Sequence, residues 1–266
     1  MDAITVPSLR EMKHEGRRIV ALTAYDYTFG QLLDRAGIDI VLVGDSLGMV
    51  MQGQSSTLPV TLEDVIYHTQ CVARGVRRAL VAADMPLGSY EEGPEQAFRS
   101  AARLMGEGGA QMVKLEGGAF LAPTVRFLVE RGIPVWAHIG LMPQHVHQLG
   151  GYRVQGRSQV AAASLKTDAR TLEDAGASLL LLEVIPAVLA SEITENATHM
   201  ATIGIGAGVS CDGQVLVLHD LLGLSDRFHP RFVKDFMDGS RNILAAVEQY
   251  VADVREGRFP GPEHSF

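Results

Sequence analysis

The chain has 266 residues, of which 47% are hydrophobic, and it carries a formal net charge of −8. This length suits one large α/β barrel or two ordinary domains. The negative charge argues against a general affinity for nucleic acid or anionic membranes and favours small-molecule partners. The two cysteines, Cys71 and Cys211, form no Cys-x-x-Cys motif, and the first residues lack a signal-peptide pattern, so we expect a reduced, cytoplasmic protein. The most apolar stretch, residues 177–190, is interrupted by Glu183 and Pro186 and is too short to span a bilayer.

Apolar runs of strand length recur along the chain and alternate with segments of helical periodicity. There are about eight such runs, at residues 18–26, 39–45, 79–86, 111–117, 134–140, 178–186, 200–208 and 213–220. Between the first two, Phe29, Leu32, Leu33 and Ala36 have the i, i+3, i+4, i+7 spacing of a helix face. The chain is therefore expected to alternate strand and helix.

Further helix starts agree with this alternation. Thr61 and Asp64 form a capping-box pattern, and Gly93-Pro94 places a proline at a first helical position. Ala97, Ala101 and Leu104 then continue with helical spacing.

The strand runs are apolar almost throughout, which is typical of parallel strands covered on both faces. About eight βα units fit a (β/α)₈ TIM barrel, so we expect an α/β protein with a single barrel domain over residues 1–266, with an N-terminal helix, a C-terminal helix and an extended tail. A doubly wound sheet is the alternative. Two connections, 46–61 and 141–159, are longer than a barrel needs, and both follow strands, which would place them over the active face.

Polar residues stand at or near the ends of these apolar runs. They are Asp45, Asp84, Lys114, Glu116, His138 and Glu183. In a barrel, inward side chains from different strands converge at the C-terminal mouth, where active sites lie. A buried charge costs several kcal/mol unless it is paired or binds a metal. Polar residues at the ends of so many apolar runs are therefore not expected by chance.

Each residue also has a structural interpretation that stays open at this point. Asp45 or Asp84 alone could cap the following helix, and Lys114 with Glu116 could form a structural ion pair. Glu183 could simply begin its loop.

The histidines and glycines are open to structural interpretations as well. His138 could be a core histidine with its hydrogen bonds satisfied. His138, His145 and His147 share a segment but lack the spacing of a zinc motif, so we do not expect zinc. Residues 204–208, GIGAG, match neither a dinucleotide turn nor a P-loop; they could admit a ligand close to the backbone or could be plain turn glycines.

Two of the carboxylates suggest a chemistry. Asp45 and Asp84 offer hard oxygen ligands of the kind that Mg²⁺ prefers, and a 2-oxo acid could chelate the same ion through its carboxylate and ketone. Such chelation would stabilise an enolate, leaving Glu183 to remove a proton from the adjacent carbon. The residues thus indicate metal-assisted enolisation without naming a second substrate.

The sequence resembles the ketopantoate hydroxymethyltransferase family from about Ser8 to the terminal PEHSF. The segments that carry the resemblance are LTAYDYTFGQLLDRAGID, VLVGDSLGMV, STLPVTLEDVIYHT, ADMPLGSY, VKLEGG, HIGLMPQ, LGGYRVQGR, IGIGAG and CDGQVLVLHDLLGL. The resemblance implies a (β/α)₈ barrel that requires Mg²⁺ and assembles as a homodecamer. It also implies transfer of a one-carbon unit from 5,10-methylenetetrahydrofolate to 3-methyl-2-oxobutanoate, giving 2-dehydropantoate on the route to pantothenate.

The resemblance further implies a role for each matching residue. The metal would be bound by Asp45, Asp84 and Glu116, the oxo acid would contact Asp45, Ser46, Asp84, Lys114 and His138, and Glu183 would accept the proton. Departures from the family pattern are local: Trp136-Ala137 stands where small or flexible residues are expected, Val184 where cysteine is frequent, and residues 195–204 are less regular.

Three alternatives remain at the level of sequence. A Mg²⁺-dependent C–C lyase of the isocitrate lyase and phosphoenolpyruvate mutase group would use similar carboxylates, although the cysteine-bearing loop of those lyases is absent. A Schiff-base aldolase would use Lys114 covalently. A non-catalytic sensor would require altered mouth residues, and none is altered.

Overall fold

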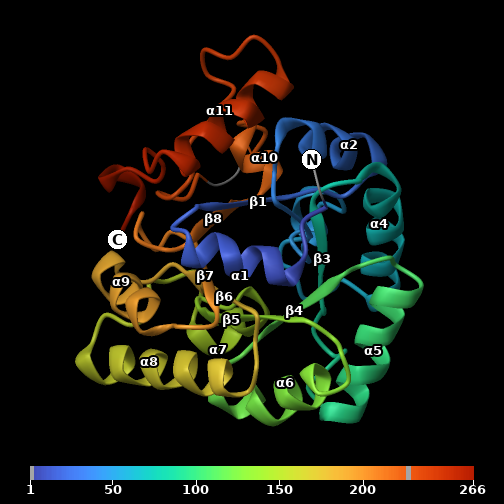
Figure 1. Ribbon diagram of the computed structural model, residues 1–266, viewed down its shortest axis with the longest axis vertical. Coiled ribbons are helices and arrows are strands. Elements are labelled where there is room, and N and C mark those ends of the chain that lie inside the picture. The colour runs from blue at the N-terminus through green and yellow to red at the C-terminus, as the bar shows by residue number, and fades with distance from the viewer. Residues whose placement is uncertain (1–2, 226–228) are drawn as a thin grey trace.

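The computed structural model describes residues 3–225 and 229–266, and its central feature is a closed barrel of parallel strands (Figure 1). Each strand pairs in parallel with the next along the chain, and the last strand pairs with the first. The strands are β1 (Ile19–Thr23), β2 (Ile40–Val43), β3 (Leu80–Asp84), β4 (Met112–Glu116), β5 (Val135–Gly140), β6 (Leu179–Glu183), β7 (Ala201–Ile205) and β8 (Gly213–Leu216). The (β/α)₈ barrel is confirmed: each predicted run contains one strand, and the doubly wound alternative is wrong.

Helices surround the barrel and follow every strand except β7, which leads to β8 through residues 206–212 without a helix, so the predicted alternation fails at this one unit. They are α2 (Tyr27–Ala36), α4 (Leu62–Gly75), α5 (Pro94–Gly106), α6 (Ala122–Val129, preceded by η1, Ala119–Leu121), α8 (Gln159–Asp174), α9 (Ala187–Asn196) and α11 (Ile243–Arg255). Thr61 caps α4 through a capping box with Asp64, and Gly93 precedes Pro94 at the start of α5, as the sequence predicts. None of the described helices is long and apolar enough to cross a membrane.

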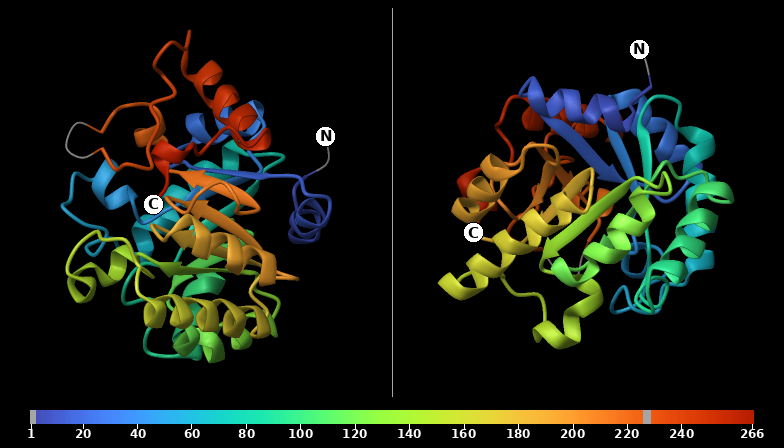
Figure 2. Two further views of the ribbon diagram at one scale, coloured as in Figure 1. Left: turned by 90° about the vertical axis from the view of Figure 1, so that its left-hand side faces the viewer. Right: turned by 60° about the horizontal axis from the view of Figure 1, so that its bottom comes forward.

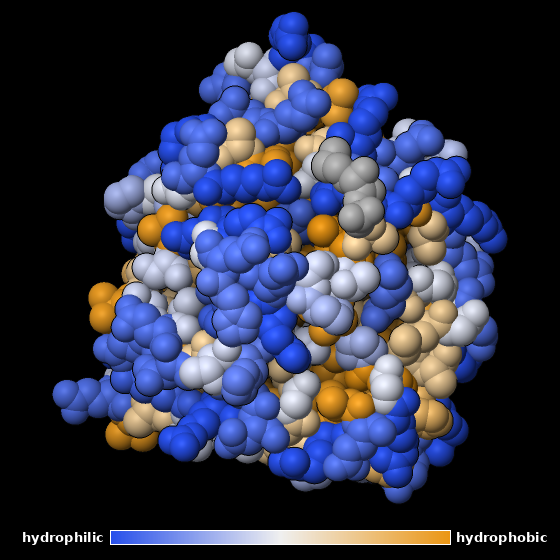
Figure 3. Space-filling model, in the orientation of Figure 1, coloured by the Kyte–Doolittle hydropathy of each residue, from blue (hydrophilic) through white to orange (hydrophobic). Residues whose placement is uncertain are grey.

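The first helix, α1 (Val6–His14), covers the end of the barrel where the strands begin. Its Leu9 and Met12 are buried, and Lys13 forms an ion pair of 2.7 Å with Asp212, just before β8. Figure 3 shows the face on which α1 lies, and this surface is mainly hydrophilic. Because α1 closes this end, the opposite end of the barrel is left for a site.

The long connections lie at that opposite end, away from α1 (Figure 2, left). Residues 46–61 include α3 (Leu47–Val50), and residues 141–159 include η2 (Pro143–His145) and α7 (Val146–Leu149). A third long connection, which the sequence analysis did not predict, joins α10 (Leu218–Leu221) to α11.

The C-terminal tail, which includes η3 (Pro262–His264), folds back onto the barrel. The ring of Phe259 packs edge-on against Phe236 and Tyr250, with centroids 5.4 and 5.8 Å apart. The carbonyl of Phe266 accepts a hydrogen bond of 2.9 Å from the main-chain N–H of Ala187, so the chain end lies beside α9 (Figure 1).

This close approach accounts for two glycines of the 204–208 cluster. Gly206 and Gly208 have φ of 60° and 81°, in the left-handed region that favours glycine. A Cβ at Gly206 would lie 3.0 Å from Phe232, and one at Gly208 would lie 2.6 Å from Ala187. Contacts within the chain therefore require glycine at both positions.

Candidate active site

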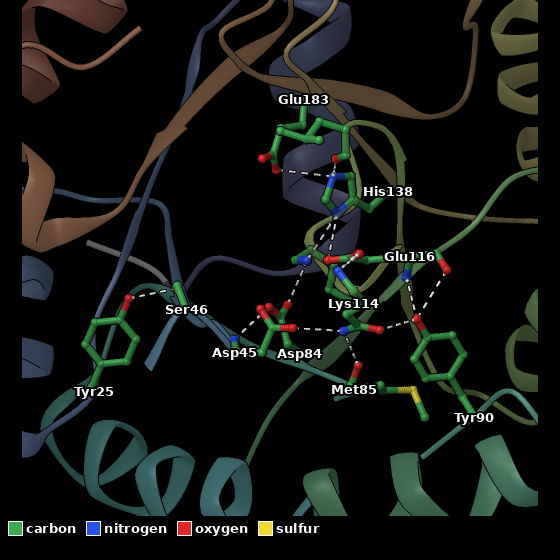
Figure 4. A network of polar contacts seen from close by, with 12 residues as sticks. Tyr25, Asp45, Ser46, Asp84, Met85, Tyr90, Lys114, Glu116, His138 and Glu183 are labelled. Atoms are coloured by element: carbon green, nitrogen blue, oxygen red, sulfur yellow. Dashed lines mark hydrogen bonds and ion pairs between the residues drawn. The ribbon is translucent and has the colours of Figure 1, made fainter. Parts of the chain in front are cut away.

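The polar side chains predicted from the strand ends converge at the C-terminal mouth of the barrel (Figure 4). Asp84 ends β3, Lys114 lies within β4 and Glu116 ends it, His138 lies in β5, Glu183 ends β6, and Asp45 follows β2. The parallel register places Asp84 beside Lys114 and Glu116 beside His138. All are buried except Glu183, whose side chain is 14% exposed.

Lys114 forms its ion pair with Asp84 rather than with its neighbour on the strand, Glu116. Lys114 Nζ lies 3.0 Å from Asp84 Oδ1, while Asp84 Oδ2 accepts a 2.9 Å hydrogen bond from the Asp45 N–H. Burial alone lowers the pKa of Lys114, but the charges of Asp84, Glu116 and Asp45 raise this pKa above its usual value. The side chain is therefore an ammonium ion.

His138 bridges two carboxylates and is 1% exposed. Its Nδ1 lies 3.5 Å from Glu116 Oε1, and its Nε2 lies 3.3 Å from Glu183 Oε2 and 2.8 Å from the carbonyl oxygen of Leu141. Burial and the Lys114 charge lower the pKa of His138, but Glu116 and Glu183 outweigh them and raise this pKa to about 9. The two carboxylates thus favour the imidazolium form, in which both ring nitrogens donate, while the Lys114 Nζ, 3.5 Å from Nδ1, opposes it.

The local backbone holds Glu183 in place. The next residue, Val184, has φ of 49°, which is an unusual conformation for a β-branched residue. On the adjacent strand, a Cβ at Gly140 would lie 2.3 Å from the Glu183 carbonyl oxygen. The ends of β5 and β6 can approach this closely only because position 140 is glycine.

Ser46 lies on the β2 side of the mouth. Its Oγ is 2.9 Å from the hydroxyl of Tyr25, which follows β1. A Cβ at Gly44 would lie 2.8 Å from Ser46 Oγ and 3.5 Å from Asp84 Oδ2, so a glycine here lets the two polar side chains approach the backbone. The structure thus brings together all seven residues that the sequence predicts for the site.

The donor chemistry of Asp45 and Asp84 fits Mg²⁺. Burial, and then the negative charges of Asp84 and Glu116, raise the pKa of Asp45 well above its usual range. This is the repulsion between buried carboxylates that a bound dication would relieve. Among the described residues, no group of three or more His, Cys, Asp or Glu side chains is arranged to hold a metal ion. Two carboxylates are sufficient for Mg²⁺, which retains waters and substrate oxygens as its other ligands.

Glu116 has both carboxylate oxygens engaged by the protein. Oε1 faces His138, and Oε2 accepts a 3.0 Å hydrogen bond from the main-chain N–H of Gln144. Although burial raises the pKa of Glu116, the His138 and Lys114 charges and these hydrogen bonds lower it below its usual value. Glu116 is therefore ionised.

The sequence analysis missed three uncharged members of the site, Tyr25, Tyr90 and Gln144. Tyr90 donates a 2.6 Å hydrogen bond to the side chain of Gln144, which in turn donates one of 2.9 Å to Asp45. The search for charges at strand ends could not find them, because they lie in connections and carry no charge. The signal that could have indicated Gln144 was its place in HIGLMPQ, directly after the strand that carries His138.

Comparison with known proteins gives consistent matches. The sequence profile of the ketopantoate hydroxymethyltransferase family matches residues 3–262. The 3-methyl-2-oxobutanoate hydroxymethyltransferase of Azoarcus sp. (strain BH72) is 62% identical over 263 residues, 99% of this chain and 97% of that protein. The protein of the same name from Aromatoleum aromaticum is 61% identical over 263 residues, with the same shares of the two chains. A solved phosphonopyruvate hydrolase, in complex with oxalate and Mg²⁺, superposes with a TM-score of 0.62 over 97% of this chain and 92% of that one; its 12% identity supports the fold alone.

Proposed function

The chain belongs to the ketopantoate hydroxymethyltransferase family and is an enzyme of that class, and we propose the reaction that its mouth residues perform. The one-carbon donor is 5,10-methylenetetrahydrofolate and the acceptor is 3-methyl-2-oxobutanoate. With one water, the products are tetrahydrofolate and 2-dehydropantoate, an intermediate on the route to pantothenate and coenzyme A. The observation that carries the proposal is the convergence of Asp45, Asp84, Lys114 and Glu183 at one barrel mouth.

In this proposal the oxo acid lies between the Lys114 ammonium on one side of the mouth and the Glu183 carboxylate on the other. The residues proposed to contact it are Asp45, Ser46, Asp84, Lys114 and His138. Lys114, fixed 3.0 Å from Asp84, faces the oxygen atoms of the acid and the negative charge that develops on them. Asp45 and Asp84 would hold Mg²⁺, which when bound supplies a Lewis acid that polarises the 2-oxo group.

Glu183 accepts the proton from C3 of the oxo acid. It is the most exposed of the four mouth carboxylates, so a substrate entering from solvent can reach it. His138, protonated on both nitrogens, orients Glu183 through Nε2. The carbon that loses the proton then forms the new bond to the one-carbon unit. Glu116 is the third carboxylate proposed for the metal site, and its oxygens also contact His138 and Gln144.

Proton exchange tests this proposal without the folate. We expect C3 of 3-methyl-2-oxobutanoate to exchange its proton in D₂O when the protein and Mg²⁺ are both present, as followed by NMR. Exchange should cease on addition of a chelator and return with Mg²⁺. Exchange that is unaffected by the chelator would refute the metal-assisted mechanism.

The alternative Schiff-base mechanism makes a different prediction for Lys114. A Schiff-base lysine needs a lowered pKa, whereas Asp84, Glu116 and Asp45 raise the pKa of Lys114. Borohydride added during turnover should therefore leave the mass of the protein unchanged. A mass increase on the Lys114 peptide that matches a reduced substrate imine would favour the covalent mechanism.

The lyase alternative is supported only by a shared fold. The solved structures of that group are 12–17% identical to this chain, which is too low to support a shared reaction.

We also propose that the enzyme acts in the cytoplasm as a homodecamer, a pentamer of dimers. Light scattering should give a mass near ten times the 28.7 kDa of one chain. A monomer at micromolar concentration would contradict this assembly.

A further inference from the structure

Gln144 has an uncharged side chain that makes three hydrogen bonds at the mouth. It lies in η2 and is 6% exposed. Its Nε2 donates hydrogen bonds of 2.9 Å to Asp45 Oδ2 and 3.0 Å to the carbonyl oxygen of Met85. Its Oε1 accepts a 2.6 Å hydrogen bond from Tyr90, and its main-chain N–H donates one of 3.0 Å to Glu116 Oε2. Both hydrogens and the oxygen of the amide are therefore used within the protein.

These partners determine which way the amide faces. If the amide were rotated by 180°, its oxygen would face the Asp45 carboxylate and the Met85 carbonyl, and three acceptors would lie together without a proton. A glutamate at this position would bring the same conflict and a further buried negative charge. Only the amide of glutamine or its shorter homologue has the required donors and acceptor.

Gln144 thereby acts on two carboxylates at once. It fixes one oxygen of Asp45, while none of the described residues donates a hydrogen bond to the other oxygen, Oδ1. Its main chain holds one oxygen of Glu116, whose other oxygen faces His138. Asp45 is thus left with Oδ1 free to bind a cation, while both oxygens of Glu116 contact other groups of the protein.

We propose that Gln144, braced by Tyr90, is a positioning residue that holds Asp45 in the orientation that binds a divalent cation. Because Gln144 belongs to the connection 141–159, the same contacts make the cation site depend on the correct folding of that connection. The inference rests on the proposed role of Asp45 and Asp84 in binding the cation. Gln144 itself contacts neither the cation nor the oxo acid.

Binding of Mn²⁺ to the full chain, without substrate, tests the inference directly. Mn²⁺ shares the preference of Mg²⁺ for oxygen ligands, and the free ion is quantified by electron paramagnetic resonance. Gln144→Met keeps the length of the side chain and removes its three hydrogen bonds. Loss of a hydrogen bond that orients a metal ligand typically weakens metal affinity by about 10- to 100-fold, so we expect the Kd for Mn²⁺ to rise by that factor.

The matched control is Gln155→Met, the same substitution in the same connection. Gln155 Nε2 donates to the carbonyl oxygen of Arg153 and does not contact the mouth carboxylates. This variant should bind Mn²⁺ as the unaltered chain does.

A second variant tests the same contact independently, in case Gln144→Met does not fold. Tyr90→Phe removes the hydroxyl that fixes Gln144 Oε1 and keeps the ring, so the Kd for Mn²⁺ should rise in the same direction but by less. In the double variant, the Kd for Mn²⁺ should rise by less than the product of the two single-variant factors, because Tyr90 acts on Asp45 through Gln144.

A turnover assay gives a second measurement. In both single variants, the Mg²⁺ concentration for half-maximal rate should rise, while kcat at saturating Mg²⁺ stays close to that of the unaltered enzyme. A purely structural role would lower thermal stability and kcat without this shift in cation dependence.

The outcomes separate the inference from the function on which it rests. If the unaltered chain binds Mn²⁺ and either folded variant, Gln144→Met or Tyr90→Phe, binds it equally well, the positioning role is wrong and the proposed function stands. If the unaltered chain binds neither Mn²⁺ nor Mg²⁺, the proposed cation site itself is wrong, and the positioning role is rejected with it.

Discussion

Glu183 differs from the other carboxylates of the mouth because solvent reaches it. Its side chain is 14% exposed, whereas Asp45, Asp84 and Glu116 are at most 4% exposed. The buried carboxylates are held by an ammonium ion, an amide and an imidazole, and each of these contacts restricts proton transfer. A base has to reach the substrate carbon, and Glu183 is the mouth carboxylate most open to a substrate that enters from solvent.

We therefore predict that Glu183→Gln binds the oxo acid but loses exchange of its C3 proton. The amide keeps the shape of the side chain and removes the base, and loss of a general base typically costs about 10²- to 10⁴-fold in rate. NMR in D₂O measures the exchange, and titration calorimetry measures binding. Glu195→Gln, on the exposed surface of α9, is the control and should exchange at the normal rate. Unchanged exchange in Glu183→Gln would transfer the role to another carboxylate, with Glu116 the first candidate.

The sequence was sufficient to find the charged members of the site but not their uncharged supports. Asp84, Lys114 and Glu183 could be found because a charge at the end of an apolar strand is costly unless it has a function. Gln144 could not be identified in this way, because an amide in a loop carries no such cost. Its importance depends on distances to Asp45 and Tyr90, which are far from it in sequence and are fixed only when the barrel closes.

At the scale of elements, the strands were predictable because each is a short apolar run buried on both faces. The long connection between α10 and α11 was not, because its path is set by contacts with residues distant along the chain. Phe236 packs on Tyr250 of α11, and Lys234 forms an ion pair of 2.9 Å with Asp253. Local sequence contains neither partner, so periodicity could not indicate where this connection lies.

Asp253 joins that connection to α11, and its removal should destabilise the fold in a pH-dependent way. Its carboxylate accepts hydrogen bonds from Lys234, Gln249 and Arg258. Burial alone raises the pKa of Asp253, but these hydrogen bonds outweigh burial and lower its pKa below the usual value. A lowered folded-state pKa contributes stability above the unfolded pKa of about 3.9, and this stability is lost as the pH falls through the folded-state pKa.

We predict that Asp253→Asn is less stable than the unaltered chain at pH 7 by about 1–3 kcal/mol, the usual range for hydrogen bonds to a charged group. The difference should narrow below about pH 4, where the carboxyl of the unaltered chain takes up a proton and comes to resemble the amide. Urea denaturation at several pH values measures both quantities. Glu248→Gln, an exposed change on the same helix, should alter stability little. A difference that is constant with pH would show that charge is not the cause.

Trp136 supports the site from the same strand as His138. The two residues are two positions apart on β5 and so point to the same side of the sheet, and Trp136 is fully buried opposite Lys114 in the register. Among the described residues, the indole Nε1 has no hydrogen-bond partner.

Since the indole contributes volume rather than a hydrogen bond, we predict that Trp136→Ala costs about 3–5 kcal/mol of unfolding free energy. Trp136→Phe should cost clearly less, because the phenyl ring fills much of the same space. Thermal and urea unfolding of both variants measure this. An equal loss in the two variants would instead point to a role for the indole N–H.

At the scale of the whole molecule, the two ends of the chain pack against different parts of the barrel. The N-terminal helix α1 covers the end where the strands begin, and the C-terminal tail reaches the connection that follows Glu183. The Ala187 N–H that donates to the Phe266 carbonyl is four residues from Glu183, and Val184 between them has a strained backbone. The tail therefore helps to hold the base in place.

Removal of residues 261–266 should consequently reduce activity more than stability. Without the Phe266 carbonyl, the segment from Glu183 to Ala187 gains freedom, and a displacement of the base by about 1 Å can lower the rate by up to about 10²-fold. The barrel core does not include these residues, so the unfolding temperature should fall only slightly.

A milder variant tests the same contact. Arg231→Met removes the hydrogen bonds of Arg231 to the carbonyl oxygens of Pro262 and Glu263, so it should lower the rate in the same direction but more weakly. C3 proton exchange in D₂O reports on the base directly, and the Kd for Mn²⁺ should stay unchanged, because the tail hydrogen-bonds to Ala187 and Arg231 rather than to Asp45 or Asp84. Normal exchange in the truncated chain would mean that the β6 end holds Glu183 without help from the tail.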